Sequence, residues 1–193
     1  MSSAVRIVAF AGSTREGSFN KKLVRLAADA ARRAGAEVTL IDLREYPLPL
    51  FDEDLEKRDG LPASGRKLKE LFRAHHGLLI STAEYNSSLP AALKNTIDWL
   101  SRPEPNQPPL SCFVDKVAAI MAASPGALGG LRCLYHLRAI LQNINVTVLP
   151  EMRAVSKAHE AFNADGTLRD ADTQAAIERI AARLVETLRR LRA

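Results

Sequence analysis

Three polar stretches of the sequence combine residue types that bind phosphate and flat aromatic groups. The first, 12–20, holds glycines, hydroxyl groups, Arg15 and Asn20 directly before a helical pattern. Free backbone N–H groups and the helix dipole at such a helix start attract a phosphate. In the alternative interpretation the stretch is an ordinary turn between a strand and a helix, with Ser18 as N-cap. The stretch 12–20 is therefore the first candidate for an anion site.

The other two stretches have residues that suit a flat ligand. The second, 82–90, places Glu84, Tyr85 and Asn86 after an apolar segment. Amides and hydroxyls beside a large aromatic fit a heteroaromatic ring, whereas in the alternative Tyr85 packs on the core. The third, 123–130, is rich enough in glycine for a ligand to approach the backbone closely, although glycines also serve turns. Neither stretch alone defines a ligand site. A site requires the fold to bring the three stretches together.

The same residues argue against several enzyme classes. Gly12 and Gly17 imitate the spacing of a P-loop, but Ser18 stands where a lysine must reach the phosphates, which disfavours an NTPase. No Gly-x-Gly-x-x-Gly occurs for a dinucleotide on the first turn. Cys112 and Cys133 lie outside the phosphate-type loop, which disfavours a cysteine-dependent phosphatase and leaves both as packing residues. We expect no metal site and no catalytic side chain, because neither a Cys/His cluster nor a triad is recognisable.

Four further polar or aromatic residues are interpreted mainly as structural. Asp42 is more typical of a cap or an ion-pair partner than of a ribose ligand. Within 91–100 we expect Asp98 and Trp99 to be structural, while Asn95 either faces a ligand or caps a neighbouring loop.

Composition narrows the remaining functions. The chain has 193 residues, of which 47% are hydrophobic and 25% charged, which predicts one globular domain over 1–193. The formal net charge of +5 suits an anionic ligand, but scattered basic residues and 5% aromatics argue against a nucleic-acid partner. No apolar run approaches the ~20 residues that cross a bilayer, and no signal peptide is recognisable. We expect a cytoplasmic protein without a membrane partner.

The apolar segments around these stretches predict an α/β fold. Strand patterns occupy 5–10, 38–41, 77–82, 117–121 and 146–149, and helical spacing occurs at 23–34, 66–74, 91–100, 130–141 and 177–191. Because the strands are uniformly apolar, we expect a doubly wound five-stranded parallel sheet with helices on both faces. Prolines interrupt 46–62, which cannot be helical throughout. The polar stretches follow the first, third and fourth strands, at the edge where such sheets bind ligands.

Taken together, the three stretches resemble one family, the NAD(P)H-dependent FMN reductases of flavodoxin-like fold, which include quinone-, azo-dye- and chromate-reducing members. The phosphate loop of the family is similar to Gly12–Arg15 with Ser18 and Asn20. Its isoalloxazine loop is similar to Glu84–Asn86 followed by Leu93–Trp99. The resemblance covers most of 5–150 and implies a flavodoxin-like fold with FMN as the cofactor.

The resemblance also implies which residues bind the flavin. The third loop of the family is similar to Ser124–Gly126 with Gly129 and Gly130, on the dimethylbenzene or ribityl side. Ala83 departs from the proline that the family usually has, which leaves the loop geometry less constrained. The region after Val155 varies within the family and carries no motif. The implied cofactor-binding residues are Ser13, Thr14, Arg15, Ser18, Phe19, Asn20, Ala83, Glu84, Tyr85, Asn86, Ser124, Gly126, Gly129 and Gly130.

The implied reaction is a ping-pong hydride transfer. NAD(P)H reduces the bound FMN, and an acceptor such as a quinone, an azo compound, free flavin or a metal oxyanion then takes the nicotinamide's place. The backbone N–H groups of Glu84, Tyr85 and Asn86 are expected to stabilise negative charge on the reduced flavin. NADPH is favoured over NADH by the family and by the positive net charge.

Partners and alternatives follow from the same resemblance. We expect a homodimer or homotetramer, with the apolar faces of 91–100 and 130–141 as candidate contacts. One alternative is a flavodoxin-type electron carrier, which the net charge of +5 disfavours because such carriers dock on basic partners. The other is a non-catalytic module that binds a phosphate-bearing ligand.

Overall fold

A parallel sheet with the strand order β2-β1-β3-β4-β5 forms the centre of the computed structural model, which describes residues 4–192. Its strands are β1 (Arg6–Ala11), β2 (Glu37–Ile41), β3 (Gly77–Thr82), β4 (Val117–Ala123) and β5 (Thr147–Val155). Every neighbouring pair is parallel, so the predicted five-stranded parallel sheet is confirmed. The order reverses between β1 and β3, and a ligand is expected at the carboxyl ends of these strands.

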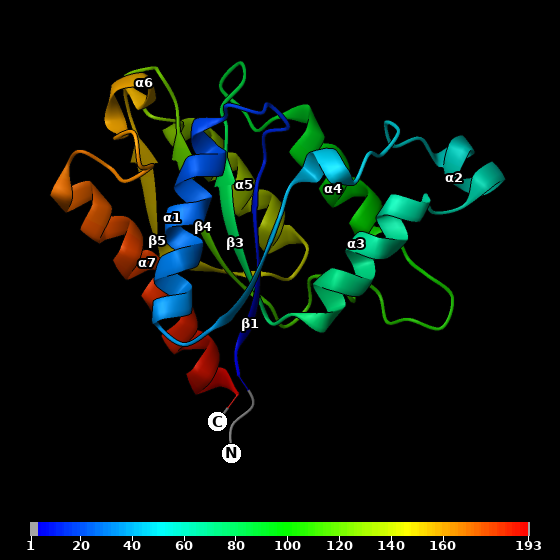
Figure 1. Ribbon diagram of the computed structural model, residues 1–193. Coiled ribbons are helices and arrows are strands. Elements are labelled where there is room, and N and C mark those ends of the chain that lie inside the picture. Colours follow the sequence, from blue (N-terminus) through cyan, green and yellow to red (C-terminus); the bar gives the residue numbers. More distant parts are fainter. Residues whose placement is uncertain (1–3, 193) are drawn as a thin grey trace.

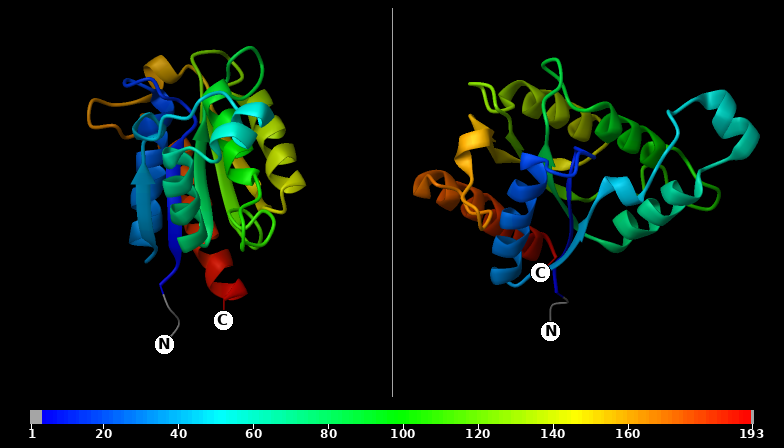
Figure 2. Two further views of the ribbon diagram at one scale, coloured as in Figure 1. Left: turned by 90° about the vertical axis from the view of Figure 1, so that its right-hand side faces the viewer. Right: turned by 45° about the horizontal axis from the view of Figure 1, so that its top comes forward.

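Helices cover both faces of this sheet (Figures 1 and 2). The first face carries α1 (Phe19–Arg33) and α7 (Ala171–Leu191). The second face carries α3 (Ala63–Ala74), α4 (Ala91–Ser101) and α5 (Leu131–Asn143). Two separate apolar clusters result, one beneath each layer of helices. This double cover explains why β3 and β4 are buried along their whole length.

The edge strand β5 differs from its prediction. It extends to Val155 instead of ending at 149, and its register with β4 shifts between Ala118 and Ile120. Pro150 lies in this irregular part, where a missing backbone N–H is tolerated because the strand has a partner on one side only. The guanidinium of Arg138 donates to the carbonyl oxygens of residues 148–150, the closest at 2.6 Å.

Smaller differences concern helix starts. The helix α3 begins three residues before the predicted 66–74, at Ala63. The helix α7 begins at Ala171 rather than at the first periodic apolar residue, because Asp170 caps it by accepting from the Thr173 amide at 3.0 Å. Short helices α2 (Glu53–Asp59) and α6 (Ala158–Ala161) lie in segments for which no helix was predicted.

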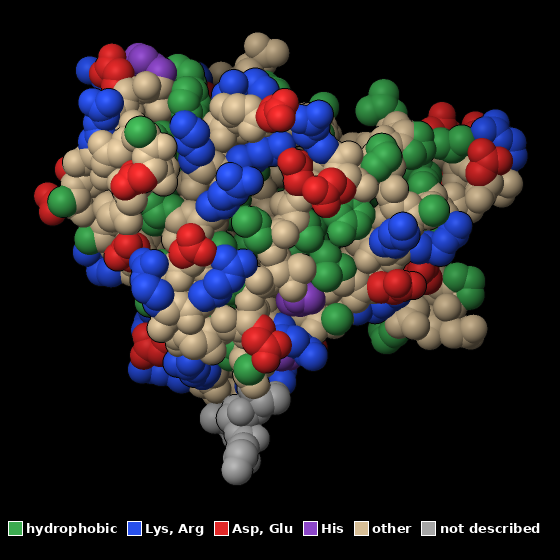
Figure 3. Space-filling view, in the orientation of Figure 1, with side chains coloured by type: hydrophobic (Ala, Val, Ile, Leu, Met, Phe, Trp, Pro, Cys, Tyr) green, Lys and Arg blue, Asp and Glu red, His purple; other side chains and the backbone are tan. Residues whose placement is uncertain are grey.

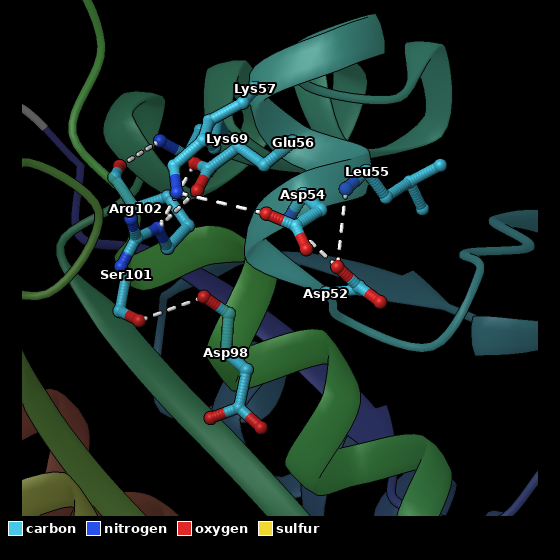
Figure 4. A network of polar contacts seen from close by, with 9 residues as sticks. All are labelled: Asp52, Asp54, Leu55, Glu56, Lys57, Lys69, Asp98, Ser101 and Arg102. Carbon is cyan, nitrogen blue, oxygen red and sulfur yellow. Dashed lines mark hydrogen bonds and ion pairs between the residues drawn. The ribbon is translucent and has the colours of Figure 1, made fainter.

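The proline-rich segment 46–62 forms an arm that carries α2 away from the sheet, beyond α3 (Figures 1 and 2). Two residues of α4, Asn95 and Trp99, and its C-cap residue Arg102 hold this arm. The Asn95 side chain accepts from the Phe51 amide at 2.8 Å, and Trp99 donates from Nε1 to the Pro49 carbonyl oxygen at 2.8 Å. Arg102 donates to both carboxylate oxygens of Glu56 at 2.9 and 2.8 Å (Figure 4). Of the two options for Asn95, capping a neighbouring loop is therefore confirmed.

The other residues interpreted as structural also have structural partners. Trp99 is fully buried, and Asp98 pairs with Lys94 at 2.7 Å. Asp42 caps the 3-10 turn Leu43–Glu45 and accepts a hydrogen bond from Lys21 at 2.5 Å, so the predicted cap and ion pair are both confirmed.

Charged side chains of both signs intermingle on the face of the molecule drawn in Figure 3. This agrees with the scattered basic residues of the sequence. None of the helices within residues 4–192 is long and apolar enough to span a bilayer.

Candidate functional site

A cleft of about 390 Å³ opens at the carboxyl ends of β1, β3 and β4. The three polar stretches thus meet at one place, as the sequence analysis predicted. The cleft is lined by Ser13, Arg15, Ser18, Phe19, Asn20, Ala83, Glu84, Tyr85, Ala123, Ser124 and Pro125. All of these except Ala123 and Pro125 are predicted cofactor-binding positions. The predicted positions that do not line it are Thr14, Asn86, Gly126, Gly129 and Gly130.

The loop between β1 and α1 presents the positive end of a helix to this cleft. Ser18 is the N-cap of α1, since its Oγ accepts from the Asn20 amide at 3.2 Å. Ser13 Oγ accepts from the Arg15 amide at 3.4 Å, and both serines are almost fully buried. The first turn of α1 contains no acidic residue, so nothing there offsets the positive potential of the helix start. The capped turn and the anion site are therefore compatible interpretations of one loop.

Arg15 supplies a cation at the mouth of the cleft. Its side chain is exposed, and its guanidinium carbon lies 5.5 Å from the centre of the Phe19 ring. Among residues 4–192 no carboxylate pairs with it. A guanidinium that is held on an aromatic ring and not neutralised by an acid is suited to bind phosphate oxygens.

Asn20 joins three elements at the floor of the cleft. Its Oδ1 accepts from the Ala123 amide and from Ser81 Oγ, each at 2.8 Å. Its Nδ2 donates to the Ala123 carbonyl oxygen at 2.9 Å. The side chain of Asn20, a residue that is 3% exposed, thus ties the start of α1 to the ends of β3 and β4. The sequence predicts Asn20 as a cofactor-binding residue and does not reveal this bridge.

The loop after β3 forms a tight turn at Tyr85–Ser88. Asn86 and Ser87 have φ of 50° and 67°, and Tyr85 and Ser88 exchange two backbone hydrogen bonds of 2.9 and 3.0 Å. The Tyr85 amide is therefore engaged within the turn, which corrects the expectation that it faces the flavin. Tyr85 is 53% exposed, so the alternative in which it packs on the core is wrong.

Glu84 is anchored to α5 and does not lie free in the cleft. Arg132 donates to its Oε1 from Nε at 3.0 Å and also from Nη2, and the Cys133 amide donates to Oε2 at 3.2 Å. Burial raises the pKa of Glu84, but the Arg132 hydrogen bonds and charge and the Cys133 amide outweigh burial and hold the pKa below its usual value. The carboxylate therefore stays ionised and compensated.

Arg132 lies outside the predicted set, although the sequence contains a signal for it. A cation in the first turn of a helix faces the positive end of the dipole and is unfavourable there without a partner. Such a residue in the first turn of a helix that follows two glycines therefore indicates a specific acidic partner, which the structure identifies as Glu84.

The glycines of the third loop permit close packing within the protein. Gly129 and Gly130 have φ of +63° and +93°, conformations that disfavour a side chain. A Cβ on Gly129 would lie 2.6 Å from backbone atoms of Val155 and Ser156. The third loop therefore rests on the segment that follows β5, and turn formation accounts for both glycines.

Both cysteines are buried packing residues, as predicted. Burial, and next the negative charge of Glu84, raise the pKa of Cys133 to about 12. Burial also raises the pKa of Cys112. A thiol that remains protonated is a poor nucleophile, which agrees with the argument against cysteine chemistry.

Within residues 4–192, no group of three or more His, Cys, Asp or Glu side chains is arranged to hold a metal ion.

Comparison with known proteins identifies relatives over most of the chain. The family model of the NADPH-dependent FMN reductases matches residues 5–160. A quinone reductase of Escherichia coli K12 is 40% identical over 152 residues, which are 77% of this chain and 76% of that protein. An NAD(P)H-dependent FMN reductase of Pseudomonas aeruginosa is 38% identical over 194 residues and the full length of both.

A solved structure gives the same result for the fold. FerB, a flavoenzyme NAD(P)H:(acceptor) oxidoreductase from Paracoccus denitrificans, superposes with a TM-score of 0.81 at 27% identity, covering 97% of this chain and 98% of FerB. The predicted flavodoxin-like fold and the predicted class of enzyme, an NAD(P)H-dependent FMN or quinone reductase, are confirmed. By the family match and the relatives alike, the chain belongs to the NADPH-dependent FMN reductase family.

Proposed function

We propose that this chain binds FMN in the cleft at the ends of β1, β3 and β4 and passes hydride from NAD(P)H to a quinone-type acceptor. The observation that carries the proposal is the meeting of a cationic helix start with the loops 83–85 and 123–125 in a single cleft. Its volume, about 390 Å³, lies in the range of small-molecule sites. FMN, when bound, supplies the two-electron chemistry, so the chain needs no nucleophile of its own.

The phosphate of FMN belongs at the β1–α1 loop. Arg15 supplies a guanidinium without an acidic partner among the described residues, and Ser13 and Ser18 supply hydroxyl groups. The helix dipole of α1 adds positive potential. Asn20 supports this loop through its bridge to Ser81 and Ala123.

The isoalloxazine belongs beside the loop after β3. The exposed ring of Tyr85 offers an aromatic wall, and the Glu84 and Asn86 amides are the donors left for a negatively charged ring edge once the Tyr85 amide is assigned to the turn. Arg132 compensates the Glu84 carboxylate, so that charge does not oppose negative charge on the ring. Thr14, Gly126, Gly129 and Gly130 act by shaping loops.

Donor and acceptor are proposed from chemical class. NADPH is the donor in the name of the family, and the net charge of +5 suits its additional phosphate. The acceptor is proposed to be a small oxidised organic molecule, because relatives are named as quinone reductases. A cytoplasmic location remains a prediction.

The test begins with a titration of the protein with FMN, followed by anaerobic addition of NADPH or NADH and then of a benzoquinone. Wild type should bind FMN, bleach the flavin absorbance rapidly with NADPH, and recover it with the quinone. Arg15→Gln should bind FMN weakly, while Arg25→Gln, at an exposed arginine within α1, should bind normally. If FMN binds but both NADPH and NADH bleach its absorbance slowly, the result would instead favour an electron carrier. No flavin binding would refute the proposal.

We also propose that copies of the chain associate through α5. Leu128, Leu131 and Tyr135 are exposed apolar residues around the start of that helix. The large apolar residues of α4 are buried within the protomer, so α4 offers less for such a contact. Light scattering after gel filtration tests this proposal. The molar mass of the wild type should be two or four times the 21.1 kDa of one chain, and Tyr135→Lys should shift the measured mass toward that of the monomer. A monomeric wild type would refute it.

A further inference from the structure

The segment that follows β5 contacts two of the three loops around the cleft. The Ser124 amide donates to the Val155 carbonyl oxygen, and the Ala158 amide donates to the Ser124 carbonyl oxygen, both at 3.1 Å. The Lys157 amide donates to Gly126 at 3.4 Å. Figure 1 shows that α6, within this segment, lies at the same end of the sheet as the start of α1. We name residues 155–168, which are the last residue of β5 and the segment that follows it, the brace.

Phe162 connects the brace to the phosphate loop. Its ring lies parallel to that of Phe19, with 6.2 Å between centres and 6° between planes. The same Phe19 ring carries the guanidinium of Arg15 at 5.5 Å. Lys22 Nζ lies 5.8 Å from the Phe162 ring. A continuous series of ring contacts therefore runs from the brace to the cation at the mouth of the cleft.

The position of Phe162 is fixed by the brace itself. Phe162 is 8% exposed and belongs to the apolar cluster beneath α1 and α7. A turn directly after it is closed by the Asn163 amide, which donates to the Thr167 carbonyl oxygen at 2.8 Å. The Arg169 amide donates to Ala161 at 2.9 Å on the other side of that turn. Because its backbone is held on both sides, Phe162 can support Phe19.

We infer that Phe162 is a positioning residue that holds Arg15, through Phe19, in place for the phosphate of FMN. The inference rests on the proposed function. An exposed arginine loses rotamer freedom when it binds a ligand, and stacking on a fixed ring removes part of that freedom in advance. Phe162 itself does not line the cleft, so its effect on the ligand passes through Arg15.

Loss of the Phe162 ring should therefore weaken the binding of flavins that carry a phosphate more than the binding of flavins without one. Loss of the Phe162 ring frees Phe19 and Arg15 but leaves the loops beside the isoalloxazine in place. FMN affinity should fall about three- to fivefold, the size expected for one exposed cation–ring contact. Affinity for riboflavin, which has the same ring system without the phosphate, should change less than about twofold.

The experiment compares FMN and riboflavin titrations of the apoprotein by quenching of flavin fluorescence. Phe162→Leu removes the ring but keeps a buried hydrocarbon, and Phe162→Tyr keeps the ring and should behave as wild type. Phe113→Leu, a buried phenylalanine of the opposite cluster, controls for general destabilisation and should leave the FMN-to-riboflavin affinity ratio unchanged. Thermal unfolding of each apoprotein monitors folding.

A double-mutant cycle with Arg15→Gln completes the test. In that background Phe162→Leu should no longer weaken FMN binding, because the group through which it acts is gone. Equal losses for FMN and riboflavin, or additive effects with Arg15→Gln, would overturn the positioning role while leaving the proposed function intact. If Arg15→Gln alone leaves the FMN-to-riboflavin ratio unchanged, the phosphate assignment fails and this inference with it.

Discussion

Arg132 in the first turn of α5 donates two hydrogen bonds to one carboxylate oxygen of Glu84, while the Cys133 amide donates to the other oxygen. The Glu84 side chain is 7% exposed, whereas that of Arg132 is 53% exposed. This pair joins the loop after β3 to the helix after β4, so the two loops on that side of the cleft form one unit.

Replacement of Arg132 by Met should loosen this unit. The nearly buried Glu84 carboxylate then loses its cation, and we expect the free energy of unfolding to fall by about 1–2 kcal/mol, less than for a fully buried pair. Urea denaturation measures it. Arg190→Met, which breaks an exposed pair with Glu186, should cost less than about 0.5 kcal/mol. Equal costs for both variants would show that the Glu84 pair stabilises the protein no more than an exposed pair does.

Replacement of Asn20 by Ala should be severe. The Ala123 amide and carbonyl and the Ser81 hydroxyl would lose buried partners, so we expect a loss of at least about 2 kcal/mol in stability. Ser81→Ala removes only one of these bonds and should cost about 1 kcal/mol. Guanidinium denaturation of both variants gives the comparison. An Asn20→Ala protein as stable as Ser81→Ala would mean that the bridge is not needed.

The Cys133 thiol should resist alkylation in the folded protein. Its pKa of about 12 leaves almost no thiolate at neutral pH, because burial and the Glu84 charge both disfavour the anion. Iodoacetamide labelling followed by peptide mass mapping should find Cys133 unmodified in the native state and modified rapidly after unfolding. Labelling at the same rate in both states would contradict the buried, protonated thiol.

Stability should depend on pH through the two histidines that follow α3. Burial lowers the pKa of His75 and of His76, and in His76 it acts with the charges of Arg192 and Arg6 to bring the pKa to about 4. The unfolded state, with a histidine pKa near 6.5, therefore binds protons that the folded state does not. The contribution is fully present above pH 6.5 and is lost as the pH falls toward 4.

Thermal melts between pH 7.5 and 4.5 test this dependence. His76→Asn keeps an acceptor for the Arg6 amide, which Nδ1 accepts at 3.1 Å in wild type, but removes the titrating ring. Its Tm should fall less steeply with acid than that of wild type. His159→Gln, at an exposed site, is the control. A His76→Asn curve parallel to wild type would refute the role of His76.

Release of the arm 46–62 should follow from loss of Arg102. This side chain bonds the Glu56 carboxylate and lies 5.1 Å from the Phe51 ring, so Arg102→Met removes two contacts at once. Chymotrypsin should then cleave within 46–62 faster than in wild type. Lys57→Met, which affects only an exposed pair at 3.8 Å, should leave cleavage unchanged. Identical cleavage in all three proteins would place the restraint of the arm elsewhere.

The sheet was predictable from the sequence because burial leaves a local pattern. The strands β3 and β4 are covered on both faces, and a run of apolar residues is the direct result. The second half of β5 was missed because an edge strand is half exposed and tolerates Pro150, so its residues resemble a loop.

The site was predictable only where its signals are local. Ser18 and Arg15 lie within one loop, and their spacing before a helix carries the information. The partners of Asn20 and Glu84 lie far away in the sequence and are fixed by the fold. Phe162 lies beyond residues 5–160, which the family model matches, and no local sequence pattern connects it with Phe19.

The irregular half of β5 also limits how copies of this chain can meet. A regular edge strand is a template on which a neighbouring chain can extend the sheet. Here Pro150 has no N–H to offer, the register is shifted, and the Arg138 guanidinium already occupies carbonyl oxygens of the strand. Continuous sheets across two copies are therefore disfavoured on this side, which protects a protein with a largely apolar central sheet from edge-to-edge aggregation.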